Sequence, residues 1–565
     1  MGVRRAVEIV LDTAHQQDAP LRTFGPLIHN PQVLTLFEEK GIKAEQRVPE
    51  SGTGSILIRA HGVPPGIKTS LASAGFSVID ATCPRVIKVQ TIIRKHARKG
   101  YASIIIGDKD HPEVVGLLGY AGDRGYVADN LQALNELPEF EKAIVVAQTT
   151  QNVRLFDDVR KWVFERFPHY KIFDTICDST ERRQKEVLRI ASLVDAVIVV
   201  GGHNSGNTQR LAEIVRQTGK QVYHIETESE LDLTALSSVA CVGITAGAST
   251  PNWIIKRVYR KLETLPAKGA FTWRKPVYLL QRALLLTNIM VGVGAGSLCF
   301  ACARLLGIEF FYPQMLIAAL YVQSMHVLNH LMGRQSDRFN DPERSEFYMR
   351  YRLSLSALAI AAGGAGLLAA YSMGWIPFLI LLVMSILGFS YNLKLVPGWF
   401  PKQPKYKRIK EIPGSKTILI AVAWGVVSAI FPSFEKMGGF DISILLTFFW
   451  ATLFVFVRTA FFDVLDMQGD RIVGKETLPI LMGEKRTLQV LKLLLLILTA
   501  ILIVSSASGI LSPLGFALAI CPALMLGVIL ANEKGLMLPG IHLEFLIEFH
   551  FVLAGIIALV WSMLA

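Results

Sequence analysis

Two cysteines occupy matching positions in the first half of the chain. Cys83 follows a short apolar run, 76–79, and directly precedes Pro84, whose fixed φ suits the first position of a helix. Cys177 also follows an apolar run and leads into the helix-like stretch 181–193. A thiol at the start of a helix is favoured as a thiolate, because free N–H groups and the helix dipole stabilise negative charge. We therefore expect both cysteines at strand-to-helix corners of repeated units that converge on one metal; the alternative is two ordinary buried cysteines.

Small polar clusters follow several other apolar runs in this half. They lie at residues 28–31, 59–63, 110–113, 147–150, 201–208 and 245–251. The last two are rich in Gly, Ser and Thr and precede helical stretches. Backbone N–H groups and hydroxyls at the start of a helix form a natural anion site, to which His29, His61 and His111 can add their imidazoles. We expect a diphosphate there, although each cluster alone is also typical of a plain helix cap.

The elements that must position these residues alternate between strands and helices. Eight strands are expected, at 55–58, 76–79, 102–106, 143–146, 171–173, 196–200, 221–224 and 240–244. Helical patterns between most of them predict an α/β fold with largely parallel pairing. Ligands bind such sheets at the carboxyl ends of the strands, which is where the polar clusters lie.

The second half of the chain has a different composition. The whole sequence has 565 residues, a mean hydropathy of +0.40 and 51% hydrophobic residues, which is too apolar for a wholly soluble protein. From about residue 276 onward, uncharged runs have the length that spans a bilayer. The net charge of +12 could suggest nucleic acid, but the basic residues of this half cluster in loops between apolar runs. We therefore expect a membrane protein and no nucleic-acid partner.

The first half has the features of a cytosolic domain. Its three cysteines form no disulfide-framework pattern, which favours a reducing compartment. The first residues lead directly into an amphipathic helical pattern, 6–14, so we expect no signal peptide.

The polar motifs in this order resemble one family over residues 1–262. The motifs HN, AHG, DATCP, HPEV, QTT, IC-x-x-T, NSGNT and TAGAS are similar to those of the IspH/LytB reductases. The resemblance implies an α/β trefoil of three pseudo-threefold units around a 4Fe–4S cluster. It also implies reductive dehydroxylation of 4-hydroxy-3-methylbut-2-enyl diphosphate to isopentenyl and dimethylallyl diphosphate, with electrons from a donor such as ferredoxin or flavodoxin.

The same resemblance assigns roles to individual residues. Cys83 and Cys177 are expected to ligate the cluster. The expected proton donor is Glu113, with His111 and Thr149 in the network around the substrate hydroxyl. The diphosphate cradle is expected from His29, His61, Ser205, Asn207 and Ser249, with Thr180 nearby.

One departure from the family concerns the cluster. The family begins with Cys-x-Gly-Val-x-Arg-Ala, and here Gly2-Val3-Arg4-Arg5-Ala6 matches with Met1 at the x. The third cysteine would therefore immediately precede Met1. Two interpretations follow: the start is placed a little too late, or the domain has lost its cluster and its activity. The intact remaining site residues favour the first.

The apolar half predicts an all-α domain of about nine transmembrane helices. They are expected near 279–303, 311–332, 353–372, 376–393, 416–432, 441–462, 487–507, 512–531 and 543–564. Basic residues concentrate in alternate loops, 334–352, 394–416 and 471–486, which places those loops in the cytosol.

Carboxylates at the end of one apolar run predict a metal site. Asp463, Asp466 and Asp470 stand at i, i+3 and i+7, on one helical face. Three carboxylates there repel one another unless a cation such as Mg²⁺ is present, and Mg²⁺ commonly bridges to a diphosphate. Arg458 is costly in lipid and so is expected to face a cavity. The alternative is a solvated acidic loop.

This second half resembles the UbiA prenyltransferases over about 275–565. The pattern D-x-x-D-x-x-G-D-x-x-x-G-x-x-T-L-P is similar to the second motif of that family, and the stretch around Lys416 is also similar. The resemblance implies Mg²⁺ and a prenyl diphosphate, which Arg458 and Lys416 would contact. The first motif, N-D-x-x-D-x-x-x-D, is degenerate, because only Asn329 and Asp337 remain as possible ligands.

Together these patterns predict a bifunctional enzyme of the cytoplasmic membrane. We expect a reductase domain at 1–265, a linker at 266–278 and a membrane prenyltransferase at 279–565 that alkylates a lipophilic acceptor. One alternative makes the membrane half a non-catalytic anchor. Another makes the reductase half an inactive binding domain on a prenyltransferase.

Overall fold

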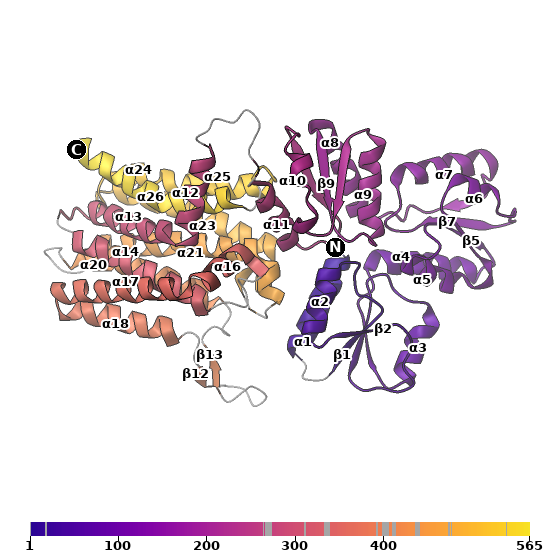
Figure 1. The fold of residues 1–565 in the computed structure, drawn as a ribbon, viewed down its shortest axis with the longest axis horizontal. Helices are drawn as coiled ribbons and strands as arrows, with labels where there is room; N and C mark the ends of the chain where they lie inside the picture. The colour runs from indigo at the N-terminus through magenta and orange to yellow at the C-terminus, as the bar shows by residue number, and fades with distance from the viewer. Residues whose placement is uncertain are drawn as a thin grey trace. The chain divides into compact units, whose positions relative to one another are not determined.

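The computed structural model resolves the chain into two compact units, Met1–Gly269 and Ala270–Ala565. It describes residues 2–16, 20–263, 265, 274–309, 312–332, 339–390, 394–397, 406–408, 414–434, 441–472, 475, 477–537 and 540–564. Figure 1 shows both units as ribbons, and each is described by itself below. Most of the expected linker, 266–273, lies outside the described residues, and helix α12 begins at Arg274.

The first unit contains three separate sheets, and every strand pair in them is parallel. The first has the order β2-β1-β3-β4, with strands Lys43–Glu45, Leu21–Phe24, Ser55–Ile58 and Ser77–Asp80. The second has the order β6-β5-β7-β8, with Gly125–Ala128, Ala102–Ile106, Ala143–Ala147 and Lys171–Ile172. The third has the order β10-β9-β11, with Gln221–Ile225, Ala196–Val200 and Val242–Ala246. The expected parallel α/β fold is thus confirmed.

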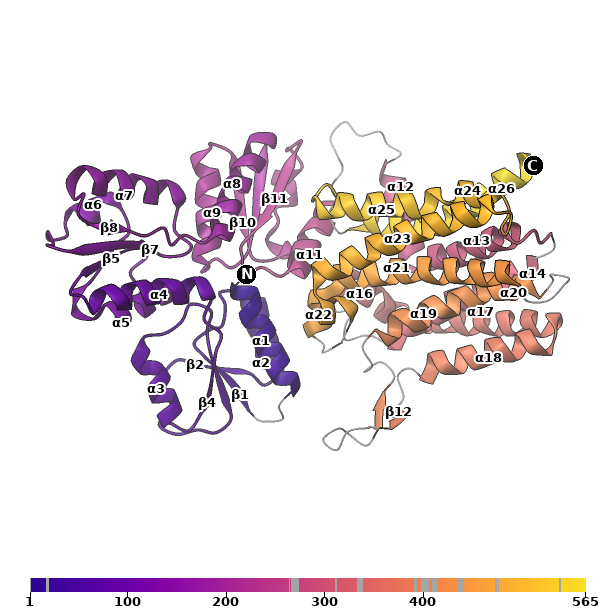
Figure 2. The same cartoon turned by 180° about the vertical axis from the view of Figure 1, so that it is seen from behind.

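Helices cover these sheets and connect successive strands. They are α1 (Gly2–Gln16), α2 (Pro31–Glu39), α3 (Pro65–Ser73), α4 (Pro84–Ala97), α5 (Pro112–Ala121), α6 (Leu131–Asn135), α7 (Val153–Arg166), α8 (Asp178–Leu193), α9 (Gly206–Gln217), α10 (Leu233–Leu236) and α11 (Asn252–Glu263). Single-turn helices η1 (Gly122–Arg124) and η2 (Glu228–Glu230) complete the set. The three sheets with their helices form three lobes, and α1 begins where the lobes meet (Figures 1 and 2).

The central strands explain why this sequence forms parallel sheets. Every residue of β3, β5, β7 and β9 is buried, and most of these residues are Val, Ile or Ala. A strand buried on both faces has a continuous apolar run, because helices cover each side of the sheet. The polar residues must then lie in the loops beyond the strand ends.

The second unit is helical. Its helices are α12 (Arg274–Leu286), α13 (Ile289–Leu305), α14 (Tyr312–Met332), α16 (Pro342–Arg350), α17 (Arg352–Met373), α18 (Trp375–Ser390), α19 (Ser415–Gly425), α20 (Phe431–Ser433), α21 (Ile442–Ile472), α22 (Leu478–Met482), α23 (Glu484–Ala507), α24 (Leu514–Leu518), α25 (Ile520–Glu533) and α26 (Ile541–Leu564). A π-helical turn, η4 (Val426–Ile430), joins α19 to α20, and a hairpin of β12 (Lys394–Pro397) and β13 (Tyr406–Arg408) completes the unit.

Several of these helices can cross a membrane. Within the described part of the chain, seven are long and apolar enough, and a bent pair raises the number to eight. Helix α18 is apolar but has only 16 residues. These helices indicate a multi-pass membrane protein.

The bent pair corrects one sequence-based expectation. The first span was expected as one helix over 279–303, but α12 and α13 meet at an angle of 77°. Asn288 lies at the break with φ 55°, in the left-handed region that asparagine tolerates better than most residues. Its side-chain amide donates to the Tyr348 hydroxyl at 2.6 Å, which holds the break in place.

Candidate active sites

The candidate site of the α/β unit is built from loops that follow strands. Residues from these loops include His61 after β3, His111 after β5, Thr149 after β7, Ser205 after β9 and Ser249 after β11. Parallel strands direct their carboxyl ends to one edge of a sheet, so each lobe presents its polar loops on one side.

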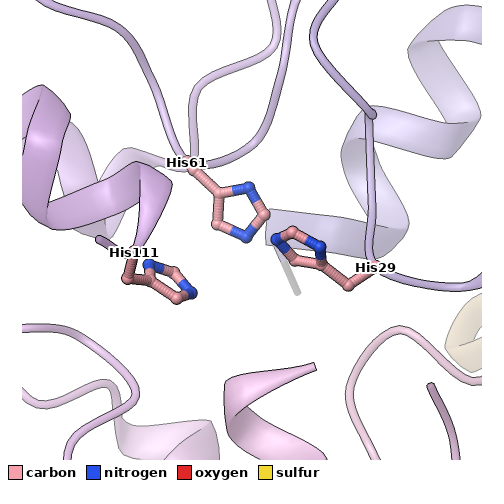
Figure 3. A group of neighbouring side chains, drawn as sticks. All are labelled: His29, His61 and His111. Atoms are coloured by element: carbon pink, nitrogen blue, oxygen red, sulfur yellow. The ribbon is translucent and has the colours of Figure 1, made fainter. Parts of the chain in front are cut away.

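Three histidines from two lobes lie close together (Figure 3). The ring centroids are 5.0 Å apart for His29 and His61, 5.3 Å for His61 and His111, and 6.0 Å for His29 and His111. Among the described residues this is the one group of three potential metal ligands, with ligand atoms within 4.8 Å of one another. The predicted convergence of these three imidazoles is therefore present.

Hydrogen bonding shows which ligand the histidines suit. Nδ1 of His111 accepts the backbone N–H of Glu113 at 3.1 Å, so a neutral His111 carries its proton on Nε2. Nε2 is then a donor and cannot bind a metal ion. His29 Nε2 and His61 Nδ1 are buried and have no hydrogen-bond partner in the described chain. Buried polar atoms without partners indicate a ligand, and donors in a cluster suit an anion.

The histidines are neutral at ordinary pH. Burial, with the neighbouring His29 as a lesser cause, lowers the pKa of His111 to about 4. Burial also lowers the pKa of His61 well below 6.5, helped by the charges of His111 and His29, and it lowers the pKa of His29. Three cations so close together would repel one another in a region of low solvation. Neutral imidazoles would hold a ligand through hydrogen bonds rather than through charge.

Glu113 is a buried carboxyl beside this cluster. It is 1% exposed, and burial raises its pKa from 4.5 to about 7. The backbone N–H of Thr149 donates to Oε1 at 2.7 Å, and its hydroxyl donates to Oε2 at 2.9 Å. These bonds favour the ionised form but only partly offset burial. A carboxyl that titrates near neutral pH is suited to donate a proton.

The third lobe supplies small polar residues. Ser205, Asn207 and Ser249 are buried, and the side-chain amide nitrogen of Asn207 has no partner in the described chain. A Cβ at Gly202 would lie 2.5 Å from the backbone oxygen of His29, so only glycine allows this approach between the first and third lobes. A Cβ at Gly206 would lie 3.7 Å from Nε2 of His111, so this turn passes directly over the histidine. Thr180 is buried in the first turn of α8.

The two cysteines occupy the corners that were predicted. Cys83 is the residue before α4 and Cys177 the residue before α8. Arg85 and Asp178, in the first turns of these helices, form an ion pair of 2.5 Å, which brings the two helix starts together. Both thiols are half-buried, and a side chain at Gly2, in the first turn of α1, would collide with Sγ of Cys83. Three helix starts therefore meet around these sulfur atoms.

Two arginines at this site were missed in the sequence. Arg59 is half-buried and lies close enough to lower the pKa of each clustered histidine, and no carboxylate pairs with it among the described contacts. Arg210 pairs with Asp108, with distances of 2.9 and 2.7 Å, and joins α9 to the loop after β5. The AHG motif drew attention to His61, and Arg59 stands only two residues before it.

The three aspartates of the helical unit lie on one helix. Asp463, Asp466 and Asp470 belong to α21, as the spacing predicts, and Asp463 and Asp470 are buried. Thr417 donates to Asp463 at 2.6 Å, and the side-chain amide of Asn340 donates to Asp470 at 2.9 Å. Lys475 pairs with Asp470 at 3.2 Å. Oxygen ligands of this kind suit Mg²⁺, but a cation would have to displace Lys475 from Asp470.

The other residues that were predicted for the prenyltransferase site do not form one cluster with the aspartates in the described structure. Asn329 is half-buried on α14, and Asp337 lies outside the described residues. Lys416 is exposed at the start of α19 and acts electrostatically on Asp463. Arg458 was expected to face a prenyl diphosphate, but its guanidinium is paired with Glu548 of α26. Glu548 follows Arg458 by 90 residues in the sequence.

These observations define a class of protein. A unit of three parallel α/β sheets gathers neutral imidazoles, a carboxyl of raised pKa and two thiols at helix starts. A multi-pass helical unit carries three carboxylates at the end of its longest helix. The chain thus combines an α/β unit that has a polar, enzyme-like centre with a multi-pass membrane unit.

Comparison with known proteins gives the families. Residues 1–263 match the LytB protein family, and residues 288–533 match the UbiA prenyltransferase family. The chain belongs to the LytB family of 4-hydroxy-3-methylbut-2-enyl diphosphate reductases and carries a UbiA prenyltransferase family domain fused behind it.

Individual relatives illustrate both parts. The 4-hydroxy-3-methylbut-2-enyl diphosphate reductase of Oleidesulfovibrio alaskensis is 42% identical over 269 residues, covering 47% of this chain and 96% of the relative. That of Opitutus terrae is 41% identical over 276 residues, with the same coverage. A solved structure of a UbiA homologue from Archaeoglobus fulgidus bound to GPP and Mg²⁺ is 19% identical, covers 50% of this chain and 98% of that chain, and has a TM-score of 0.32.

Proposed function

We propose that the first unit reduces 4-hydroxy-3-methylbut-2-enyl diphosphate to isopentenyl and dimethylallyl diphosphate. The observation that carries the proposal is a carboxyl of raised pKa, Glu113, beside three neutral histidines, of which His29 and His61 have a buried nitrogen atom without a partner in the described chain. Family membership supports it, because the reductases named above share about two fifths of their residues with this unit.

In this proposal the diphosphate is bound by donors from the first and third lobes. His29 and His61 belong to the first lobe, and Ser205, Asn207 and Ser249 belong to the third. The backbone N–H groups at the start of α9 add to them. Because the histidines are neutral, the recognition depends on directed hydrogen bonds, while Arg59 supplies positive charge near the cluster.

Glu113 supplies the proton that the departing hydroxyl needs to leave as water. Thr149 bonds to both carboxyl oxygens and so fixes the orientation of the acid. His111, with its proton on Nε2, can donate to the same hydroxyl and hold it beside Glu113. Burial excludes competing water from the carboxyl.

Cys83 and Cys177 would hold the iron–sulfur cluster of this family, because thiols at helix starts favour the thiolate form that iron requires. When bound, the 4Fe–4S cluster supplies the electrons of the reduction, which a protein such as ferredoxin or flavodoxin delivers. Gly2, in the first turn of α1, lies close to Cys83, because a Cβ built on it would collide with the sulfur. This supports the expectation that a cysteine added before Met1 completes the ligand set.

An anaerobic comparison tests this proposal. The unmodified chain and a chain with Cys added before Met1 are purified without oxygen. The iron content per chain and the rate of substrate reduction are then measured for both. We expect the added cysteine to give the higher iron content and turnover. If neither chain reduces the substrate when loaded with iron and sulfide, the reductase proposal is wrong.

For the helical unit we propose prenyl transfer to a lipophilic acceptor. Asp463 and Asp466 would hold Mg²⁺ and, through it, a prenyl diphosphate, with Lys416 close by. In this proposal the bent pair and α18 also cross the membrane, which gives nine spans in the cytoplasmic membrane. The α/β unit then lies in the cytosol, on the side of the basic loops.

A specific observation favours a second candidate function, a non-catalytic anchor. Asp463 and Asp470 already have protein partners, including the ammonium group of Lys475, so the carboxylates are satisfied without a cation. Replacing Asp463 by Asn discriminates between the two. Loss of a radiolabelled prenylated product supports transfer, and a chain that forms no such product before or after the change supports the anchor.

A further inference from the structure

A buried ion pair lies in the core of the helical unit. Nε of Arg458 on α21 donates to both carboxylate oxygens of Glu548 on α26, at 3.1 Å each, and Nη2 also bonds to Oε1. The two residues are 5% and 4% exposed. Trp424 and Phe462 lie against the guanidinium, with ring centroids at 5.5 and 5.3 Å. The arginine is therefore held and neutralised by protein groups alone.

Two polar atoms beside this pair have no hydrogen-bond partner in the described chain. They are Nε1 of Trp424, a residue 2% exposed, and Nε2 of His326 on α14. The two rings meet edge to face, with centroids 6.2 Å apart. Leaving a buried polar group unsatisfied is costly, so two such groups on neighbouring rings indicate a ligand.

We propose that Trp424 and His326 form a subsite for the uncharged oxygen function of an apolar molecule, such as the hydroxyl of a phenol or alcohol. The indole N–H can only donate, whereas the imidazole nitrogen can accept. A hydroxyl satisfies both, because its oxygen accepts from Trp424 while its O–H donates to His326. This inference rests on the proposed prenyltransferase function and names the class of its acceptor as neutral.

The ion pair sets the charge preference of the subsite. A carboxylate ligand would need a free cation, but Glu548 already occupies the guanidinium of Arg458 through three hydrogen bonds. An acidic ligand would therefore meet a buried pair whose positive charge is already neutralised by another carboxylate. Phe551 packs on Trp424 at 5.3 Å and adds an apolar wall. The subsite thus selects against acids and for neutral hydroxyl compounds.

Photolabelling of the full chain in lipid nanodiscs tests this preference. Two probes carry the same diazirine-bearing alkyl chain, one on a phenol and one on a benzoic acid, and labelled peptides are mapped by mass spectrometry. We expect the phenol probe to label α14 and α19 saturably and at least about tenfold more than the acid, a ratio that corresponds to about 1.4 kcal/mol. Equal labelling, or a preference for the acid, would overturn the proposal. This arm uses the unmodified chain and so needs no variant to fold.

Variants identify the groups that bind. Trp424→Phe and His326→Phe each remove one polar atom and should reduce phenol labelling about tenfold. Trp450→Phe is the matched control, because Trp450 is fully buried and also has an unpartnered Nε1, but stacks on Phe454 rather than beside His326. Unchanged labelling in the first two variants, or an equal loss in the control, would show that the aromatic core alone binds the probe.

Product formation separates this inference from the function on which it rests. If the chain forms a prenylated product but the probe is not bound selectively, the subsite is wrong and the prenyltransferase proposal stands. If the phenol probe binds as expected but no prenyl transfer occurs in the unmodified chain, the transfer proposal fails and the subsite is a site for a neutral lipid.

Discussion

Replacing Glu113 by glutamine tests the proton donor through two independent properties. The side chain is 1% exposed, and its pKa is raised from 4.5 to about 7. Glutamine keeps the shape and can still accept the Thr149 N–H at its carbonyl oxygen, while its amide donates to the Thr149 hydroxyl. The substitution therefore removes the titration and leaves the hydrogen-bonding capacity in place.

The raised pKa of Glu113 makes the folded chain less stable as pH rises. Between pH 4.5 and 7 the folded chain binds this proton and the unfolded chain releases it, so stability falls as pH rises. The fall is about 1.4 kcal/mol per pH unit and reaches about 3 kcal/mol above pH 7. We expect Glu113→Gln to equal the unmodified chain in stability near pH 4.5 and to exceed it by about 3 kcal/mol at pH 8.

Hydrogen exchange of β5 and β7 in the metal-free chains measures the difference in stability between Glu113→Gln and the unmodified chain at about pH 4.5 and about pH 8. Infrared difference spectra between the two chains follow the protonated carboxyl directly. Glu141→Gln is the control, because the Glu141 side chain is 91% exposed and should give no pH-dependent gain. A carboxyl that titrates below about pH 5.5, or a stability difference that does not change with pH, would refute the assignment of Glu113 as a buried acid.

Activity gives the second readout of the same change. Only the protonated form of Glu113 can deliver a proton, so reduction should fall about tenfold per pH unit above pH 7. Glutamine should lower the rate about 10²- to 10⁴-fold at every pH and should bind substrate as before. A Glu113→Gln chain of normal activity would remove the acid from the proposed reaction.

Three further predictions concern other residues. Arg59→Gln should raise the KM for the diphosphate about tenfold with little change in kcat, because it removes the unpaired charge beside the histidines, and steady-state kinetics measures this. Cys83→Ser should lower iron per chain after reconstitution while circular dichroism stays unchanged; equal iron content would contradict the ligand assignment. Glu548→Gln should destabilise the helical unit by about 3–5 kcal/mol by leaving Arg458 unpaired, seen as a lower midpoint of thermal unfolding in detergent, whereas Arg458→Met with Glu548→Leu should recover much of the loss.

The central strands of the α/β unit could be predicted because short apolar runs indicate buried strands. Ala196–Val200 is wholly apolar and Ala102–Ile106 is apolar except for Ser103, and the structure has strands over the same residues. Strands β1, β2 and β6 were missed. β2 has the sequence KAE and is mostly exposed at a sheet edge, and β1 and β6 are short and lack a continuous run of Val and Ile. Their pairing depends on neighbours that the local sequence does not specify.

The site could be predicted at the level of which loops converge. The polar clusters after the strands were expected to share one anion site, and the rings of His61 and His111, which follow strands of two different sheets, lie 5.3 Å apart. The proton position on His111 could not be predicted, because it depends on the backbone N–H of Glu113 two residues later. The partner of Arg458 also could not, because a buried charge requires a partner but the sequence does not say which acid provides it.

Helix α21 is longer than a membrane is thick. Its 31 residues extend about 46 Å, whereas about 20 residues cross the hydrocarbon core of a bilayer. If the hydrocarbon core begins at Ile442, it ends just before Asp463, and the aspartates then lie near the depth of the lipid headgroups. A long-chain substrate bound there would have its apolar tail in the hydrocarbon core of the bilayer and its charged end among the lipid headgroups. Lipid composition, and anionic lipids that compete for cations in particular, should then influence this half of the protein.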